Sequence, residues 1–291
     1  MYSMTGFGRG VCEIDGREMT IELKSVNHRF LDVSMRMPRS MNFLEDAIRK
    51  QLQANLARGH VDVSLSYANH REDGREAMID HAVVRAYQQA AQELAQMGVE
   101  GQLRLADVLR IPDAVTLSEK QEDQQALTEL MEKTIALAIG QIKQARLEEG
   151  VRMGADIASR LRLILEKREA IAQREPLVVS EYAQRLRERV ATLLGDAAQP
   201  DEARLMQEVA VFADRASIAE ELTRLKAHIE SIFEAMQSEQ AIGRRLDFIV
   251  QELNRETNTI GSKASDMQIL SLVVDIKAEI EKIREQVQNI E

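Results

Sequence analysis

Residues 122–142 read EDQQALTELMEKTIALAIGQI, and strand patterns stop at this point of the chain. Apolar and small residues recur there at helical spacing, namely Leu127, Leu130, Met131, Thr134, Leu137, Ala138 and Ile142. The stretch continues to residue 173 without a proline, which predicts long helices packed as a hairpin or bundle. Pro176 is expected to end that run and to start another helix, which reaches about Leu194.

The first 70 residues instead alternate apolar and polar side chains, as strands with one buried face do. Three such runs are Met19, Ile21 and Leu23; Leu31, Val33, Met35 and Met37; and Val61, Val63, Leu65 and Tyr67. Asp15 and Gly16 form a hairpin signal between two strands. Residues 43–56 are predicted to form a helix across the apolar face, and a second helix at 80–97 is predicted to cover the rest. A small antiparallel sheet with helices is therefore expected.

The predicted fold class is α+β and mostly α, in three parts. Residues 1–120 form an α+β domain, 121–200 a long helical hairpin or connector, and 201–291 a helical domain that carries the candidate active site. The best linker candidate is 195–200. Three helices are expected after it, the first with an apolar stripe from Leu205 to Met236.

The last helix has a regular apolar seam, with spacings of four and three, at Ile269, Val273, Ile276, Ile280, Ile283, Val287 and Ile290. Such a seam is typical of a coiled coil and requires a partner helix. The spacing leaves open whether that partner lies in the same chain or in another subunit.

Composition narrows the class of protein. The 291 residues contain no run of about 18 apolar residues and no signal-peptide pattern, so a cytoplasmic protein without a membrane partner is expected. The single Cys12 excludes an intrachain disulfide and a multi-cysteine zinc site. The sequence has no phosphate-binding glycine loop and no dinucleotide fingerprint, so no organic cofactor is expected. The net charge of −10 comes from the helical part, since residues 1–75 hold 11 Lys and Arg against 10 Asp and Glu.

Residues 243–263 read GRRLDFIVQELNRETNTIGSK and predict a helix with one apolar stripe and two polar rows. One row holds Asp247, Gln251, Asn254 and Asn258, and the other holds Arg245, Glu252, Glu256 and Thr259. Asparagine is a poor helix former, so this pattern favours groups placed for contacts. The alternative is an ordinary solvated face with surface ion pairs worth about 0.2–0.5 kcal/mol each.

The chain resembles the YicC-like endoribonucleases at both of its ends. The C-terminal motif comprises Asp214-Arg215, Ala219-Glu220-Glu221-Leu222, Arg224-Leu225, His228, Gly243-Arg244-Arg245-Leu246-Asp247-Phe248, Gln251-Glu252, Asn254-Arg255-Glu256, Asn258-Thr259 and Ser262-Lys263. The N-terminal motif comprises Met1-Tyr2-Ser3-Met4-Thr5-Gly6-Phe7-Gly8-Arg9, Ser25-Val26-Asn27-His28-Arg29-Phe30-Leu31-Asp32 and Arg58-Gly59. The resemblance implies a bacterial endoribonuclease that requires a divalent metal, Mn²⁺ or Mg²⁺, and acts on RNA as a homo-oligomer, with a hexamer as the expected form.

The spacing of acids in this region suggests a metal site. Glu221, Arg224 and His228 share one helical face, with Glu220 at its edge. We expect metal ligands among Glu220, Glu221, His228, Asp247, Glu252 and Glu256, and catalytic groups among the same set without Glu220. A hard divalent ion there would polarise a phosphoryl oxygen and lower the pKa of a bound water. The alternative for His228 is a structural histidine on an amphipathic helix.

RNA contacts are expected from basic and amide side chains. Phosphates would meet Arg224, Arg244, Arg245, Arg255 and Lys263, while Asn254 and Asn258 would read 2′-hydroxyls or bases. The polar sheet face offers Arg9, Arg29 and Arg36 as further phosphate contacts. Aromatic residues are only 3% of the chain, so few rings can stack on bases, among them Phe7, Phe30 and Phe248.

Two other function classes stay open, a non-catalytic RNA-binding or chaperone protein and a helical scaffold. A different cleavage chemistry also stays open, in which His28, His60 or His228 acts as acid or base and the 2′-hydroxyl of the RNA attacks.

Overall fold

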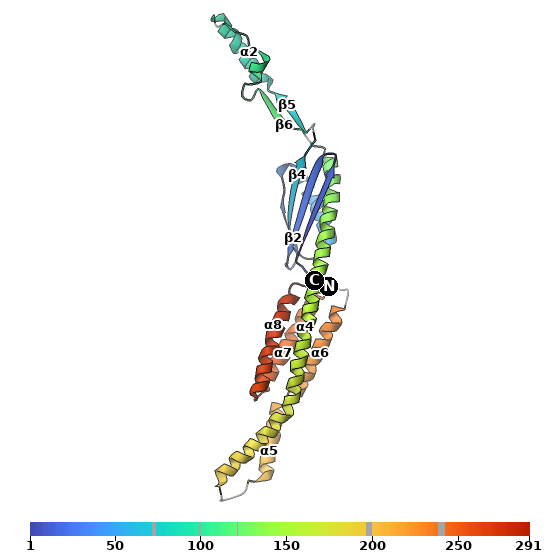
Figure 1. Ribbon diagram of the computed structural model, residues 1–291, viewed down its shortest axis with the longest axis vertical. Helices are drawn as coiled ribbons and strands as arrows, with labels where there is room; N and C mark the ends of the chain where they lie inside the picture. Colours follow the sequence, from blue (N-terminus) through green and yellow to red (C-terminus); the bar gives the residue numbers. More distant parts are fainter. Residues whose placement is uncertain (72–73, 99, 121, 196–199, 238–241) are drawn as a thin grey trace.

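The computed structural model describes residues 1–71, 74–98, 100–120, 122–195, 200–237 and 242–291. The molecule is elongated, with a β-sheet unit in its middle, a helical unit at one end and a small arm at the other (Figure 1). It is mostly helical with a four-stranded N-terminal sheet, which confirms the predicted α+β class. No described helix is long and apolar enough to span a bilayer.

The sheet has the strand order β1-β2-β4-β3. Its strands are β1 (Gly6–Ile14), β2 (Arg17–Val26), β3 (Leu31–Arg36) and β4 (Gly59–Asn69). The predicted hairpin is confirmed, since Asp15 and Gly16 have φ values of 50° and 70° between β1 and β2. The expectation of a purely antiparallel sheet is wrong at one edge, because β3 pairs parallel to β4. Between β3 and β4 a helical segment carries the chain back to the end of the sheet where β3 began. Two parallel neighbouring strands require such a crossover connection.

The inner face of the sheet forms one of two hydrophobic cores. Met19, Ile21 and Leu23 of β2 are fully buried, as the strand alternation predicted. The 3₁₀ helix η1 (Arg39–Leu44) and α1 (Glu45–Asn55) cover this face and contribute Met41, Leu44, Ile48 and Leu52. The helix predicted at 43–56 is thus confirmed.

The rest of that face is covered by α4 (Gln124–Leu194). Glycines at every second position of β1 allow α4 to lie directly on the strand. A Cβ atom on Gly8 would lie 2.2 Å from the carbonyl oxygen of Ala138, and one on Gly10 would lie 2.0 Å from that of Thr134. Only glycine fits such an approach.

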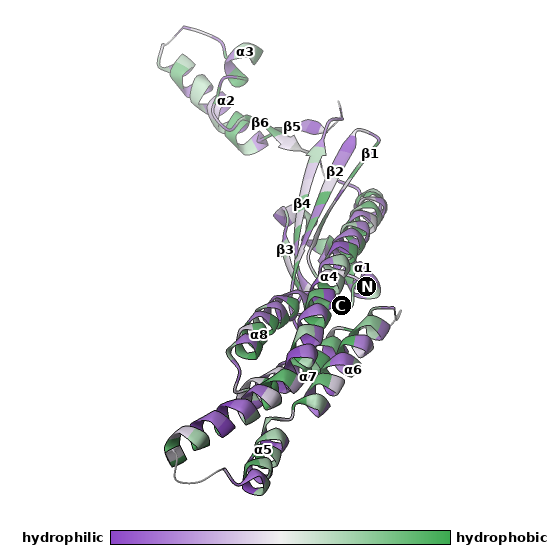
Figure 2. Ribbon diagram, turned by 60° about the horizontal axis from the view of Figure 1, so that its bottom comes forward, coloured by the Kyte–Doolittle hydropathy of each residue, from purple (hydrophilic) through white to green (hydrophobic). Residues whose placement is uncertain are grey.

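The helix predicted at 80–97 exists but does not cover the sheet. It is α2 (His81–Gln96), begun by the side chain of Asp80, which accepts hydrogen bonds from the amides of Ala82 and Val83. None of its residues is buried. It belongs to the arm with β5 (Arg75–Ile79), α3 (Leu105–Val108) and β6 (Val115–Glu119), and the β5–β6 hairpin carries it beyond the end of the sheet (Figures 1 and 2).

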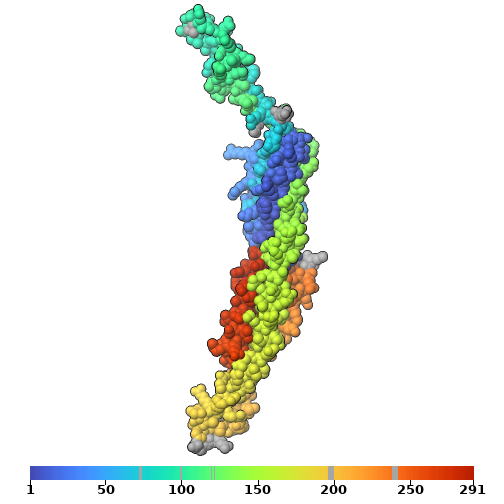
Figure 3. All heavy atoms as spheres, in the orientation of Figure 1, coloured from blue at the N-terminus to red at the C-terminus, as the bar shows by residue number. Residues whose placement is uncertain are grey.

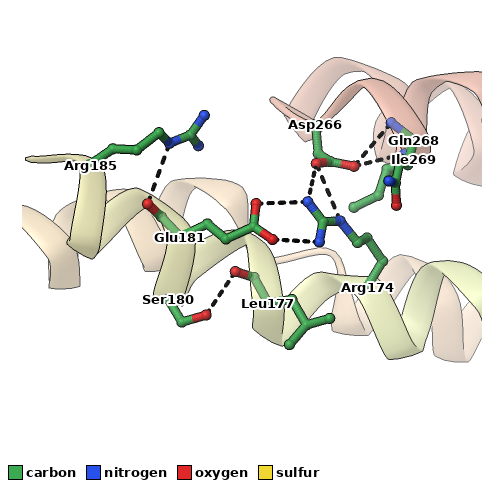
Figure 4. A network of polar contacts seen from close by, with 8 residues as sticks. All are labelled: Arg174, Leu177, Ser180, Glu181, Arg185, Asp266, Gln268 and Ile269. Carbon is green, nitrogen blue, oxygen red and sulfur yellow. Dashed lines mark hydrogen bonds and ion pairs between the residues drawn. The ribbon is translucent and has the colours of Figure 1, made fainter.

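The predicted hairpin within 121–200 is wrong, because α4 is one continuous helix that runs through Pro176. The ribbon bends in its last third, as expected where proline removes a backbone hydrogen bond (Figure 1). Side chains bridge the bend. Arg174 donates to Glu181 at 2.6 Å and 2.8 Å and to Asp266 at 2.8 Å (Figure 4). Tertiary contacts therefore hold the helix together where local sequence would end it.

Within the described residues after α4, the structure has four helices rather than the predicted three. They are α5 (Glu202–Ala216), α6 (Ala219–Met236), α7 (Gly243–Lys263) and α8 (Met267–Val287). The predicted stripe from Leu205 to Met236 is split at Ser217 and Ile218, where Glu175 of α4 accepts a hydrogen bond from the Ile218 amide at 2.9 Å. Most of the linker expected at 195–200 lies outside the described residues.

The apolar seam of α8 is satisfied within the chain. Six of the seven predicted positions lie in α8 and Ile290 follows its end, and all seven are buried in the second hydrophobic core, where α8 packs on α4 and α7. Figure 3 shows α8 directly against α4 in the space-filling view. Arg160 and Lys167 of α4 add ion pairs to Glu279 and Asp275, at 2.9 Å and 2.7 Å.

The two ends of the chain meet where the sheet unit joins the helical unit (Figure 1). The amide of Met4 donates to the carbonyl of Asn289 at 2.8 Å. Arg146 of α4 is 2% exposed, hydrogen-bonds to the hydroxyl of Ser25, and lies 3.3 Å from the carboxylate of Glu291. Two features therefore join the units: the helix α4, which both share, and a buried polar contact around Arg146.

Candidate metal centre

The candidate site lies between α6 and α7, which pack against each other. The end of α7 meets the start of α6, so the two helices run in opposite directions. Buried aliphatic residues along one stripe of each helix fix the pairing, namely Leu222, Leu225, Ile229, Ile232, Leu246, Val250, Leu253 and Ile260. Lys263 at the end of α7 meets Glu221 at the start of α6, which sets the offset of the two helices. Polar side chains on the edge of this stripe therefore face each other across the pair.

Three of these side chains converge. His228 of α6 and Glu252 and Glu256 of α7 each offer one ligand atom, and these atoms all lie within 4.8 Å of one another. Glu252 and Glu256 are one helical turn apart and so point the same way. Glu256 is 5% exposed, while His228 and Glu252 are half-buried. We call these three residues the triad.

The triad suits a divalent cation on chemical grounds. Two carboxylates bring the negative charge that Mg²⁺ and Mn²⁺ prefer, and an imidazole nitrogen is a better ligand for Mn²⁺ than for Mg²⁺. A carboxylate as buried as Glu256 requires nearby positive charge, and the exposed guanidinium of Arg224 lies 3.8 Å from it. The donor set thus fits a bound cation and favours manganese of the two.

Guanidinium groups flank the triad on its solvent side. Arg224 lies 3.8 Å from the carboxylate of Glu256 and also pairs with Glu220. Arg255 lies 3.8 Å from Glu252. Their side chains are 57% and 74% exposed, so both can reach an anion that arrives from solvent. A cation site with arginines at its rim is suited to a phosphate group.

Glu221 does not join the triad. Its carboxylate accepts from Lys263 at 2.7 Å, and Lys263 also donates to the carbonyl of Ser217 at 3.1 Å. Burial opposes ionisation of Glu221, but the hydrogen bond from Lys263 and nearby positive charge outweigh it, so the pKa of Glu221 lies below its usual value. The structure therefore gives both residues a contact that ties α6 to α7.

Two other predicted ligands lie outside the triad. Glu220 is exposed and pairs with Arg224. Asp247 accepts a hydrogen bond from Gln251 at 2.9 Å, and it lies about 140° around α7 from Glu252. Asn254 and Asn258 share that outer row and are exposed. The row of Asp247 thus faces solvent rather than α6.

The remaining predicted RNA contacts form two groups. Arg244 and Arg245 are exposed in the first turn of α7. Arg9, Arg29 and Arg36 are exposed on the sheet unit, where Arg9 lies 3.6 Å from Glu22 and Arg29 lies over the ring of Phe30. Figure 1 places the sheet and the α6–α7 pair in different units of one chain.

The three histidines considered for metal-free cleavage lie in two different units of the chain. His60 lies 2.7 Å from Asp32 and 3.4 Å from Asp62, and its ring meets that of His28 edge-on. The hydrogen bond to Asp32 raises the pKa of His60. The pair on the sheet and His228 on α6 thus belong to separate units.

Sequence reasoning missed a polar cluster around Glu122, where the sheet meets the arm. Its carboxylate contacts Arg17 at 3.0 Å, Arg71 at 3.0 Å and the hydroxyl of Tyr67 at 2.6 Å. Burial, together with this hydrogen bond, raises the pKa of Tyr67. The cluster lines a cavity of approximately 780 Å³. Its members come from three distant segments, so no local motif signals it.

Fold and site together define a chain with a mixed sheet, a shared long helix and a candidate cation site rimmed by arginines. Comparison with known families gives the class. Residues 1–155 match the family model described as "Endoribonuclease YicC-like, N-terminal region", and residues 171–291 match "Endoribonuclease YicC-like, C-terminal". The chain belongs to the YicC-like endoribonuclease family, which confirms the resemblance noted in the sequence.

Two curated relatives align over the full length. The "Probable endoribonuclease YicC" of Clostridioides difficile (strain 630) is 38% identical over 290 residues, which cover 99% of each chain. The protein of the same name from Haemophilus influenzae (strain ATCC 51907 / DSM 11121 / KW20 / Rd) is 34% identical over 297 residues, which cover 100% of each chain.

Proposed function

We propose that this protein is an endoribonuclease that hydrolyses phosphodiester bonds in single-stranded or looped RNA with a divalent metal, Mn²⁺ or Mg²⁺. The observation that carries the proposal is the triad of His228, Glu252 and Glu256, with ligand atoms within 4.8 Å of one another. Membership of the family and the names of both relatives support RNA as the substrate.

Each residue of the site has a defined part. The triad holds the cation, which when bound supplies positive charge at the scissile phosphate and makes a nearby water more acidic. Arg224 and Arg255 stabilise the charge that builds up on the phosphate oxygens, because they are exposed next to the carboxylates. Lys263 and Glu221 keep α6 and α7 in register rather than contact the reacting atoms.

Other groups bind the RNA away from the cut. Arg244 and Arg245 continue the basic edge of α7, and Asn254 and Asn258 offer amides on its outer row. Arg9, Arg29 and Arg36 offer phosphate contacts on the sheet unit. With a net charge of −10, the chain collects these cations most effectively if several subunits face one RNA. We therefore propose a homo-oligomer, with a hexamer as the expected form, and light scattering measures its mass.

A cleavage assay tests the proposal. A 5′-labelled RNA hairpin with a single-stranded tail is incubated with the protein in Mn²⁺, in Mg²⁺ and in EDTA, and the product ends are identified. We expect cutting in the metals and none in EDTA. Glu252→Gln should lower the rate at least about a hundredfold while RNA binding persists. Glu230→Gln is the matched control, because Glu230 is an exposed acid on α6 that lies 3.9 Å from the exposed Lys226.

Three results would contradict the metal reaction. Cutting that persists in EDTA and leaves cyclic phosphate ends would instead favour histidine acid–base chemistry with attack by the 2′-hydroxyl. Salt-dependent binding without any product would favour the non-catalytic RNA-binding alternative. The absence of both binding and cutting would leave a helical scaffold.

A further inference from the structure

Phe248 is an exposed aromatic residue beside the triad. It is 63% exposed on α7. The two other aromatic residues after residue 200 are both occupied, since Phe212 stacks on Tyr182 at 3.8 Å between ring centroids and Phe233 packs against the helical core. An apolar ring that stays in water loses the stabilisation that burial would give it. Phe248 is thus the aromatic ring in this unit that a ligand can use.

The position of Phe248 on α7 relates it to the metal ligands. It precedes Glu252 by one helical turn, which places it about 6 Å along the axis and about 40° around it. Arg245 lies about 20° around the helix from Glu252, on the same edge. Arg244, the residue before Arg245, lies about 40° around the helix from Phe248, on the side away from Glu252, and is exposed as well. An exposed ring and two guanidinium groups therefore lie next to the triad along one edge of α7.

We propose that this edge is a nucleobase-binding subsite, in which the ring of Phe248 stacks on an unpaired base next to the phosphate held at the triad. Arg245 and Arg244 contact the adjoining phosphates. The proposal rests on the function proposed above and adds the substrate preference. Every base has a π-face, so one ring binds any sequence. Bases of a duplex already stack on their neighbours, so the subsite selects unpaired RNA.

The chain's composition supports this role. Aromatic residues make up 3% of the sequence and there is no tryptophan, so few rings are available for stacking. Phe30 is equally exposed, at 63%, but it lies on the sheet unit under the guanidinium of Arg29. Phe248 and Phe30 thus have the same exposed fraction, but Phe248 lies on the helix that carries Glu252 and Glu256, and Phe30 lies on the sheet unit. This pair provides an internal control.

Binding is measured in EDTA, so that no cutting is needed, with a single-stranded oligoribonucleotide that carries 2-aminopurine at each position in turn. We expect Phe248→Ala to raise the Kd for the single strand about tenfold and to abolish quenching at one position, with little effect on a duplex of the same sequence. Phe248→Tyr keeps the ring and should stay within about twofold of the wild type. Phe30→Ala should leave that quenched position unchanged.

The same variants are compared in cleavage, where Phe248→Ala should raise KM much more than it lowers kcat and should weaken the preference for single strands. An unchanged Kd and an unchanged quenching profile in Phe248→Ala would overturn the proposal. So would a change in the mass of the oligomer, measured by light scattering, in Phe248→Ala, since Phe248 would then be a contact between copies of the chain. If the wild type binds RNA with this profile but never cuts it, the subsite stands and the endoribonuclease proposal fails.

Discussion

Lys263 at the end of α7 donates to the carboxylate of Glu221 at the start of α6, with Nζ 2.7 Å from Oε1. Glu221 is 7% exposed, so loss of the ammonium group would leave a buried carboxylate without its main partner. The pair lies at the same helix interface as the triad and sets the offset that brings His228 opposite Glu252 and Glu256. Stability and metal affinity should therefore change together when this pair is broken.

Lys263→Met should lower the free energy of unfolding by about 1–3 kcal/mol, less than for a fully buried pair because Lys263 is partly exposed. Lys226→Met is the control, because Lys226 is exposed and lies 3.9 Å from Glu230, and it should cost under about 0.5 kcal/mol. Denaturant unfolding and Mn²⁺ titration measure both effects. Equal stability of the two variants would contradict the role of Lys263.

The contribution of the Lys263–Glu221 pair to the free energy of unfolding should also depend on pH. The pKa of Glu221 in the folded protein lies below its usual value of 4.5, so its stabilising contribution is present above that value. As pH falls through the folded pKa, the contribution is lost. The gap in stability between wild type and Lys263→Met should therefore narrow at acid pH, and a gap that stays constant down to pH 3 would argue against an ionic contact.

Gly8→Ala tests the contact between β1 and α4. The new Cβ would lie 2.2 Å from the carbonyl oxygen of Ala138, so the helix must shift away from the strand. We expect a loss of about 2 kcal/mol or more in unfolding free energy. Gly140→Ala on α4 is the matched control. A Cβ there would enter open space among the described residues, so the change should stabilise the helix by roughly 0.5–1 kcal/mol.

Arg146→Met tests the junction of the two units. Burial lowers the pKa of Arg146, yet its guanidinium still contacts Ser25, Arg58 and Glu291, all of which would lose a partner. The expected loss is about 2–4 kcal/mol. Arg152→Met, two turns further along α4, removes an exposed pair with Glu149 and should cost under about 0.5 kcal/mol. A similar thermal shift in both variants would mean that the junction contributes little.

His60 should titrate above its usual value of 6.5, because the carboxylate of Asp32 stabilises its charged form. Asp32→Asn should bring the pKa back toward 6.5, while Asp46→Asn on α1 should not. Because the folded pKa is raised, any stability from this pair is complete below the unfolded pKa and is lost as pH rises through the folded one. Proton NMR of the imidazole resonances measures the pKa, and an unchanged value in Asp32→Asn would remove the assigned cause.

Local patterns predicted most secondary structure, because alternation and helical spacing are properties of neighbouring residues. These patterns failed where contacts between distant parts of the chain determine the local structure. Pro176 lies inside α4 because packing and the Arg174 network hold the helix on both sides of it. The parallel edge strand β3 depends on a crossover that alternation does not encode. The glycines of β1 are required because α4 lies directly on that strand, where Gly8 faces Ala138, 130 residues later in the chain.

The candidate site shows the same limit. Helical spacing placed five acids and His228 on the two helices α6 and α7, but the offset between these helices decides which turns meet. That offset comes from buried residues such as Leu225 and Leu253, together with the Lys263 contact. It brings His228 to Glu252 and Glu256 and leaves Asp247 on the outer row. Pairing of two helices is a tertiary property, so one sequence could not show it.

The central claim is that His228, Glu252 and Glu256 hold the catalytic cation. Anomalous diffraction at the manganese edge, from crystals grown with MnCl₂, locates the ion directly. We predict a peak about 2.0–2.3 Å from the imidazole nitrogen and both carboxylates, which disappears in Glu252→Gln. A protein that cuts RNA in Mn²⁺ but shows its anomalous peak elsewhere, with nothing at these three residues, would contradict the account.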